Sequence, residues 1–183
     1  MKNDISGAAA VLGAMRIIAH RKPRLNVIAL IPSAENMPDG NALRTGDVIP
    51  SKSGRRIEIL DTDCEGRLLL CDTFTYAHTL GATHLIDIAT LSGACERAFA
   101  DVVTPVMGYD RPTGERLLAA GQATGELLCE MPLLPAYRAM LNTSSADLKN
   151  YGGSAAAAIT AGPTGIGVRL LAEYAQALVH EVA

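Results

Sequence analysis

The sequence lacks several features that would assign it to a common class. No uncharged run is long enough to cross a membrane, because Asp, Arg or Gly interrupts each candidate within about 18 residues. Charged and polar residues follow Met1 at once, so the chain shows no signal-peptide pattern. Basic residues are not in excess, since 16 Lys and Arg face 19 Asp and Glu, for a net charge of −3. We therefore expect a cytoplasmic protein that binds neither membranes nor nucleic acid.

Cysteine is scarce and follows no metal-binding pattern. The four cysteines are Cys64, Cys71, Cys95 and Cys129. They form no Cys-x-x-Cys pair, and no histidine stands at zinc-finger spacing from them. Without a secretory signal, free thiols in a reducing compartment are the simplest interpretation. Each cysteine is therefore expected to be a small apolar side chain rather than a ligand.

What the sequence does contain is the composition of a globular domain. Of its 183 residues, 49% are hydrophobic and 19% are charged. A chain of this length can bury its own core without disulfides or structural metals. There is no internal repeat and no low-complexity linker, so we expect residues 1–183 to form a single domain.

Hydrophobic patterning alternates between helical and strand-like segments. Helices are predicted for residues 5–20, 67–80, 111–124 and an Ala-rich tail from 154 onward. Strands are predicted for 25–31, 55–60, 83–89 and 102–107, with 25–31 and 83–89 buried. Gly7 and Gly13 each cost a helix about 1 kcal/mol relative to Ala, which suggests close packing there. The alternation predicts an α/β fold with a mostly parallel central sheet flanked by helices.

An acidic turn, residues 61–67, joins the strand at 55–60 to the helix at 67–80. It reads Asp61-Thr62-Asp63-Cys64-Glu65-Gly66-Arg67. It follows the carboxyl end of a strand, where open α/β sheets bind ligands. Two carboxylates about 4 Å apart repel by roughly 4 kcal/mol at an effective dielectric near 20. The turn would therefore take up protons or bind a cation such as Mg, Mn, Ca or Zn.

Two other interpretations of the acidic turn remain open. It could cap the following helix, with Arg67 as a counter-charge. It also fits a calcium EF-hand loop in part, with Asp72 at the twelfth position. Against the EF-hand, a strand rather than a helix precedes the turn, and the twelfth position is Asp rather than the usual Glu.

Several stretches resemble motifs of the leucyl aminopeptidase (cytosol aminopeptidase) family. Residues 61–68 are similar to the family signature Asn-Thr-Asp-Ala-Glu-Gly-Arg-Leu. Further similarity lies in residues 1–9, 35–38, 46–48, 88–94 and 146–161. The resemblance implies the catalytic domain of a metalloexopeptidase with a zinc-exopeptidase-like fold. It would hydrolyse N-terminal residues, Leu preferred, from peptides with a free N-terminus.

The resemblance also implies roles for individual residues. Asp4 would ligate one divalent ion, Asp63 the other, and Glu65 would bridge both. The two ions would be Mn or Zn, with Mg as a further candidate. Arg67 would be catalytic and stabilise the oxyanion through a bound bicarbonate.

Four more residues would contact the substrate. The backbones of Leu91 and Gly93 would bind the peptide, and Met1 and Thr90 would line the pocket for its N-terminal side chain. The family forms hexamers through this domain, so a homo-oligomer is expected.

The sequence also departs from the family pattern. An upstream Lys, Asp and second Lys, together with the family's N-terminal domain, have no counterpart here. Asp61 replaces Asn, Cys64 replaces Ala, and Ser154 stands where Arg is usual. The family's closing stretch is not recognisable after Gly162. We therefore expect an incomplete α/β fold with weak metal binding and little activity. The alternative is a non-catalytic remnant that only mediates oligomerisation.

Overall fold

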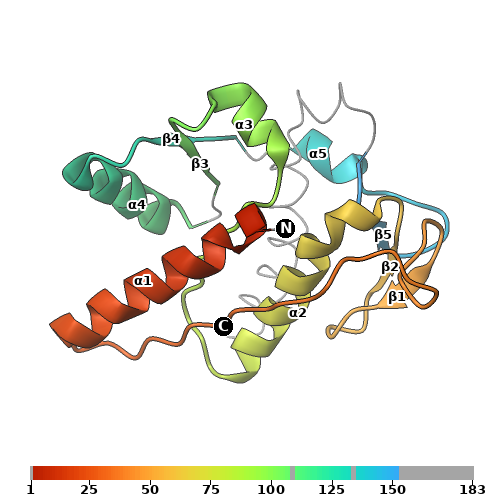
Figure 1. Cartoon of the computed structure of the whole chain (residues 1–183), viewed down its shortest axis with the longest axis horizontal. Helices are drawn as coiled ribbons and strands as arrows, with labels where there is room; N and C mark the ends of the chain where they lie inside the picture. Colours follow the sequence, from red (N-terminus) through yellow and green to blue (C-terminus); the bar gives the residue numbers. More distant parts are fainter. Residues whose placement is uncertain (1, 108–109, 133–134, 153–183) are drawn as a thin grey trace.

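The structure, a computed structural model, describes residues 2–107, 110–132 and 135–152 (Figure 1). Met1 and the helix expected from residue 154 lie outside the described residues. The helical elements are η1 (Lys2–Ile5), α1 (Ser6–Arg21), η2 (Thr62–Cys64), α2 (Glu65–Thr79), α3 (Gly93–Phe99), α4 (Arg111–Thr124) and α5 (Pro135–Ala139). The strands are β1 (Val48–Pro50), β2 (Arg56–Glu58), β3 (Thr104–Val106), β4 (Leu128–Glu130) and β5 (Leu148–Lys149).

The three long helices confirm the helical predictions, and local signals set their ends. Lys22 ends α1 in the left-handed conformation at φ 49°, and its N–H donates to the Ile18 carbonyl at 2.8 Å. The Asp110 carboxylate accepts from the Thr113 N–H at 3.1 Å at the start of α4. Gly125 ends α4 at φ 79°, a conformation that glycine adopts without strain. No helix among the described residues is long and apolar enough to cross a bilayer.

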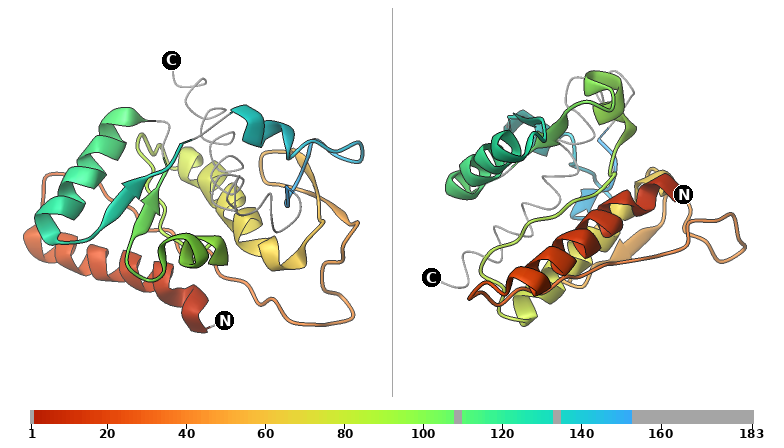
Figure 2. Two further views of the ribbon diagram at one scale, coloured as in Figure 1. Left: turned by 90° about the horizontal axis from the view of Figure 1, so that it is seen from above. Right: turned by 60° about the vertical axis from the view of Figure 1, so that its left-hand side comes forward.

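Two small sheets confirm the α/β character. In the first, β2 pairs antiparallel with β1 and parallel with β5, and Ile57 lies opposite both Ile49 and Leu148. In the second, β3 pairs parallel with β4. Figures 1 and 2 place β3 and β4 with α3 and α4 at one end of the molecule. They place the first sheet with α5 at the other end, beside α2. The strands predicted for 55–60 and 102–107 are therefore confirmed.

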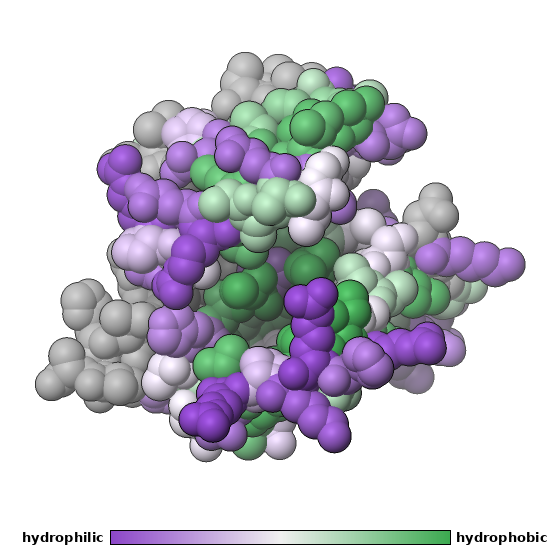
Figure 3. Space-filling view, turned by 90° about the vertical axis from the view of Figure 1, so that its left-hand side faces the viewer, coloured by the Kyte–Doolittle hydropathy of each residue, from purple (hydrophilic) through white to green (hydrophobic). Residues whose placement is uncertain are grey.

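The buried strands predicted for 25–31 and 83–89 are wrong. Neither segment pairs with a strand among the described residues. Leu25 is 72% exposed, and Ile28 and Ile86 are 61% and 58% exposed. Strand propensity reflects how well a side chain suits a half-buried sheet, but a strand also needs a neighbouring chain that accepts its hydrogen bonds. Figure 3 shows apolar side chains gathered in a hollow with a polar rim on the face at the left of Figure 1.

The core lies between α2 and the three-stranded sheet. Ile57, Cys71, Leu141 and Leu148 are each at most 1% exposed and pack as one cluster, with Ile49 and Leu68 against it. Cys71 therefore serves as an apolar core residue, as the sequence predicts. No disulfide joins any two of the four cysteines, all of which lie among the described residues. The same packing of α2 on the sheet fixes the position of the acidic turn, which connects the two.

Candidate functional site

The acidic turn folds as a capped 3-10 turn that leads directly into α2. The Asp61 carboxylate accepts from the Asp63 N–H at 3.0 Å, and the Asp61 carbonyl accepts from the Cys64 N–H at 3.3 Å. Asp61 is thus the N-cap of η2. The carboxylate therefore caps this 3-10 turn, whereas α2 itself begins after Cys64 without a side-chain cap.

The EF-hand geometry is absent from the acidic turn. An extended segment rather than a helix precedes it. Asp72 lies within α2, where its carboxylate accepts from the Lys52 N–H at 2.7 Å. The twelfth position is therefore engaged in an intramolecular hydrogen bond.

Asn150 anchors the start of the acidic turn from a distant part of the chain. Its side-chain oxygen accepts from the N–H groups of Leu60 and Asp61 at 2.8 and 3.3 Å. Its side-chain nitrogen donates to the Asp61 carbonyl at 2.6 Å. Asn150 is completely buried. Sequence reasoning missed this residue, because no periodic pattern marks a contact across 90 residues.

A second asparagine, Asn36, links the acidic turn to the loop that precedes β1. Its side-chain nitrogen donates to the Thr62 carbonyl at 3.2 Å. Asn36 belongs to the family-like stretch 35–38, but the sequence does not indicate this contact. The turn is therefore fixed from two directions, by the loop before the sheet and by the segment after β5.

Arg67 lies inside the protein, at 2% exposure. Its Nη1 donates to the Asn150 carbonyl at 2.7 Å. Burial lowers the pKa of the guanidinium, while Cys64, Asp61 and Tyr151 act in the opposite direction. An arginine remains charged even when its pKa falls, so Arg67 places a fixed positive charge beneath the acidic turn.

The two carboxylates of the turn that are expected to bind metal, those of Asp63 and Glu65, flank Cys64 in the sequence. Asp63 is exposed and Glu65 is half-buried. Burial raises the pKa of the Cys64 thiol to about 11; Arg67 opposes this rise, and Asp61, Asp63 and Glu65 add to it. Cys64 therefore stays a neutral thiol at neutral pH, because burial and the negative charges of the turn both disfavour its thiolate.

The structure brings the other family-like segments toward this turn. A Cβ on Gly66 would lie 3.1 Å from Cδ1 of Leu91, so α2 begins against the segment expected to bind substrate. A Cβ on Gly7 would lie 2.9 Å from Cα of Ala89, so α1 packs closely on the same segment. Gly7 is three residues after Asp4, which is exposed in η1.

The remaining predicted residues lie close in sequence to these contacts. Thr90 is exposed and directly precedes Leu91, while Gly93 begins α3. Ser92 caps α3 by accepting from the Ala94 N–H at 3.2 Å. Met1 lies outside the described residues. Segment 88–93 therefore contacts both segment 2–9, through Gly7, and segment 61–67, through Gly66.

The carboxylates of Asp4, Asp63 and Glu65 are ligands of the kind that a hard divalent cation prefers, but they do not gather around one point. Carboxylate oxygens are the ligands that Mg and Mn prefer and that Zn also accepts. Within the described residues, however, no three His, Cys, Asp or Glu side chains gather closely enough to hold an ion. Asp4, Asp63 and Glu65 therefore do not close a metal site by themselves.

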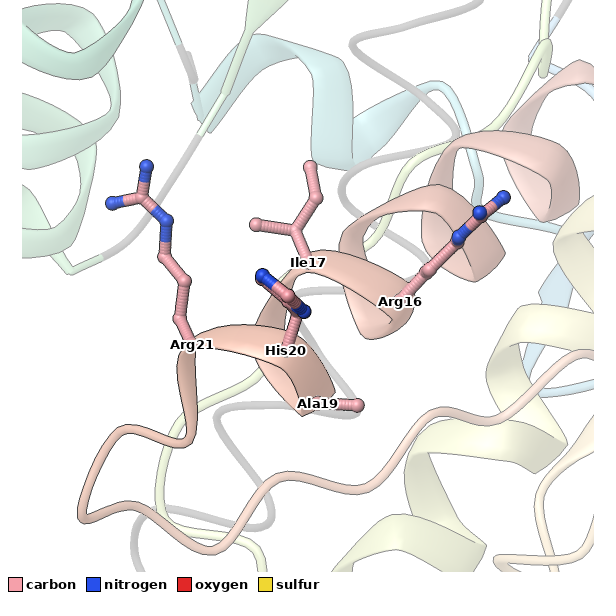
Figure 4. Close-up of a pocket in the computed structure, with 5 residues that line it drawn as sticks. All are labelled: Arg16, Ile17, Ala19, His20 and Arg21. Carbon is pink, nitrogen blue, oxygen red and sulfur yellow. The ribbon is translucent and has the colours of Figure 1, made fainter.

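Another hollow lies at the far end of α1, away from the acidic turn. Figure 4 shows its lining residues, Arg16, Ile17, Ala19, His20 and Arg21, which all belong to the last turns of α1. The two arginine side chains point away from one another. The hollow contains no residue of the candidate site, and its polar groups do not converge on a common point.

Comparison with known proteins gives a consistent assignment. The catalytic domain of the cytosol aminopeptidase family matches residues 1–164. A probable cytosol aminopeptidase of Alkaliphilus metalliredigens is 48% identical over 162 residues, which cover 88% of this chain and 32% of that protein. One from Geobacter sulfurreducens is 41% identical over 213 residues, covering 98% and 43%. The chain thus spans between about a third and two fifths of the length of these relatives.

Solved structures agree with the sequence relatives. A mutant of tomato leucine aminopeptidase is 35% identical, with a TM-score of 0.86 over 95% of this chain and 34% of that one. The bottromycin maturation enzyme BotP in complex with Mn is 34% identical, with the same TM-score of 0.86 over 95% and 38%. The expected fold class and family are confirmed, and the chain belongs to the cytosol aminopeptidase family, within its catalytic domain.

Proposed function

We propose that this chain provides part of the active site of a metal-dependent aminopeptidase, which releases N-terminal residues, Leu preferred, from peptides. The observation that carries the proposal is that one family-like segment, 88–93, contacts two others. Gly66 lies against Leu91, and Gly7 lies against Ile88 and Ala89. The likeness to leucine aminopeptidase and to a Mn-bound enzyme supports the same assignment.

The carboxylates of Asp63 and Glu65 would hold divalent ions, with Asp4 as a further ligand. If they were bound there, two ions of Mn or Zn would supply a hydroxide nucleophile at neutral pH. The described residues gather no three potential ligands, so this role requires ligands beyond them. The contribution of the acidic turn is to present two carboxylates on a backbone that Asn36 and Asn150 hold in place.

Arg67 would stabilise the negative charge of the oxyanion, directly or through a bound bicarbonate. Its guanidinium is fixed by the Asn150 carbonyl and therefore needs little reorganisation during the reaction. The backbones of Leu91 and Gly93 would bind the peptide. Thr90, which is exposed, and Met1 would contact its N-terminal side chain. We also propose a cytoplasmic enzyme that assembles as a homo-hexamer.

The test is hydrolysis of leucine p-nitroanilide by the 183-residue chain, with and without added Mn²⁺ or Zn²⁺. Because the described residues gather no three potential ligands, we expect weak metal binding and a low but metal-dependent rate. Asp63→Ala should abolish the metal-dependent part, whereas Asp101→Ala, in an exposed loop, should leave it unchanged. Glutamate p-nitroanilide serves as the comparison for leucine preference.

Two results would contradict parts of this proposal. A rate that is the same in EDTA and in Mn²⁺ would exclude metal-dependent hydrolysis. Absence of any heat of Mn²⁺ binding by calorimetry, for wild type and Asp63→Ala alike, would favour the non-catalytic remnant. A rate near that of a full-length family member would instead show that the 183-residue chain supplies a sufficient ligand set.

A further inference from the structure

Asn150 is the buried polar residue that joins the two ends of the acidic turn. Its side chain bonds to the backbone of Leu60 and Asp61 at the first end. Its carbonyl accepts from the Arg67 guanidinium at the other end. A fully buried amide is stable only when its donors and acceptors find partners, and these contacts supply them.

The backbone N–H of Asn150 extends the sheet by one hydrogen bond beyond its last strand pair. The β2–β5 ladder ends with Glu58 opposite Lys149, and the Asn150 N–H then donates to the Glu58 carbonyl at 3.0 Å. From Leu60 onward the side chain replaces the backbone as the hydrogen-bonding partner. The chain can therefore turn away from the sheet at Asp61 without leaving buried N–H or C=O groups unsatisfied.

We propose that Asn150 is a positioning residue of the aminopeptidase site, which fixes the direction in which the acidic turn presents Asp63 and Glu65. This inference rests on the proposed function, since it assigns Asn150 a purpose in cation binding. Asn150 touches no ion itself and acts through the backbone at 60–61 and through Arg67. Groups that orient metal ligands in this way typically change metal affinity by about 10- to 100-fold when they are removed.

The chemistry of the contact specifies an amide. Two N–H groups require an acceptor, and the Asp61 carbonyl requires a donor. Asp at this position keeps the acceptor and the size but, when ionised, has no hydrogen to donate. Ala removes all three side-chain contacts. The two substitutions therefore form a graded series, in which Asn150→Asp should retain more of the geometry than Asn150→Ala.

The experiment uses NMR on the full 183-residue chain, with Mn²⁺ alone as the probe. Amide hydrogen exchange first reports the geometry. The amides of Leu60 and Asp61 should be protected in wild type and exchange fast in Asn150→Ala, while that of Ile59, bonded to the Asp47 carbonyl, stays protected. Paramagnetic broadening by Mn²⁺ then reports cation binding at Asp63 and Glu65.

We expect the Mn²⁺ concentration for half-maximal broadening to rise by about tenfold or more in Asn150→Ala, and by less in Asn150→Asp. Asn142→Ala, which removes an exposed asparagine after α5, should match wild type. Protection at Ile59 shows that a variant is folded, and if Asn150→Ala does not fold, Asn150→Asp carries the comparison.

The outcomes separate the two proposals. Equal broadening in wild type and the folded Asn150 variants would overturn the positioning role alone. Absence of broadening in wild type would overturn the proposed function, and the positioning role with it. Unchanged protection at Leu60 and Asp61 in Asn150→Ala would refute the hydrogen-bonding arrangement itself.

Discussion

Gly7 and Gly13 lie on the same helix but should respond in opposite directions to substitution by Ala. A Cβ at position 7 would lie 2.9 Å from Cα of Ala89 and 3.0 Å from the carbonyl carbon of Ile88. At position 13 nothing lies within 4 Å. The obstacles at position 7 are backbone atoms, so no side-chain rotation relieves them. Only a displacement of α1 away from segment 88–89 would relieve these close contacts.

The magnitudes follow from two opposing effects. Ala favours a helix over Gly by up to about 1 kcal/mol. Overpacking against rigid surroundings costs about 1–3 kcal/mol, and backbone obstacles favour the upper part of that range. We therefore expect Gly7→Ala to lower the free energy of unfolding by about 2 kcal/mol, and Gly13→Ala to raise it by up to about 1 kcal/mol.

Urea unfolding followed by circular dichroism measures both variants under the same conditions. A difference of about 3 kcal/mol between them corresponds to roughly 6–12 °C in Tm for a chain of this size. If Gly7→Ala proved as stable as Gly13→Ala, the close packing of α1 on segment 88–89 would be incorrect. The convergence that supports the proposed function would then lose one of its two contacts.

Two further predictions concern the acidic turn. The Cys64 thiol should react with iodoacetamide with a pH midpoint near 11, because burial and the surrounding carboxylates raise its pKa. In the unfolded chain the Cys64 thiol has the lower pKa and ionises first as pH rises. The free energy of unfolding, measured by urea titration, should therefore decrease between about pH 9 and 11. Cys64→Ala should remove that decline, and a midpoint near 8.5 would contradict the burial. Arg67→Met should lower the free energy of unfolding by about 2 kcal/mol, because a buried charged donor to Asn150 is lost; an unchanged urea midpoint would show that this hydrogen bond is not significant.

The helices could be predicted from the sequence because their hydrogen bonds are local. The ends of α1 and α4 depend on residues next to them, Lys22 before Pro23 and Asp110 with Gly125. Strands depend on partners far along the chain. β5 has only two residues, too few to show any alternation, and it pairs with β2 some 90 residues earlier in the chain.

Apolar character misled the prediction for residues 25–31 and 83–89. These segments contain the β-branched and aliphatic side chains of a buried strand, and the prediction of burial rested on that composition alone. Burial depends on what lies against the segment, which composition does not specify. The same limit explains the two glycines of α1: both suggested close packing, but only Gly7 faces another segment among the described residues.

The capping interpretation of the acidic turn accounts for one of its three carboxylates. The cap and the cation site were alternatives for all three carboxylates, yet the structure divides them by residue. Asp61 is committed to the cap, whereas Asp63 is exposed and Glu65 half-buried. Asp and Asn cap helices about equally well, so Asp in place of the family's Asn preserves the turn. The substitution instead changes the local charge, because Asp61 adds a negative charge beside Cys64 and raises the pKa of its thiol. This charge lies next to Asp63 and Glu65, the two carboxylates that the proposed function requires.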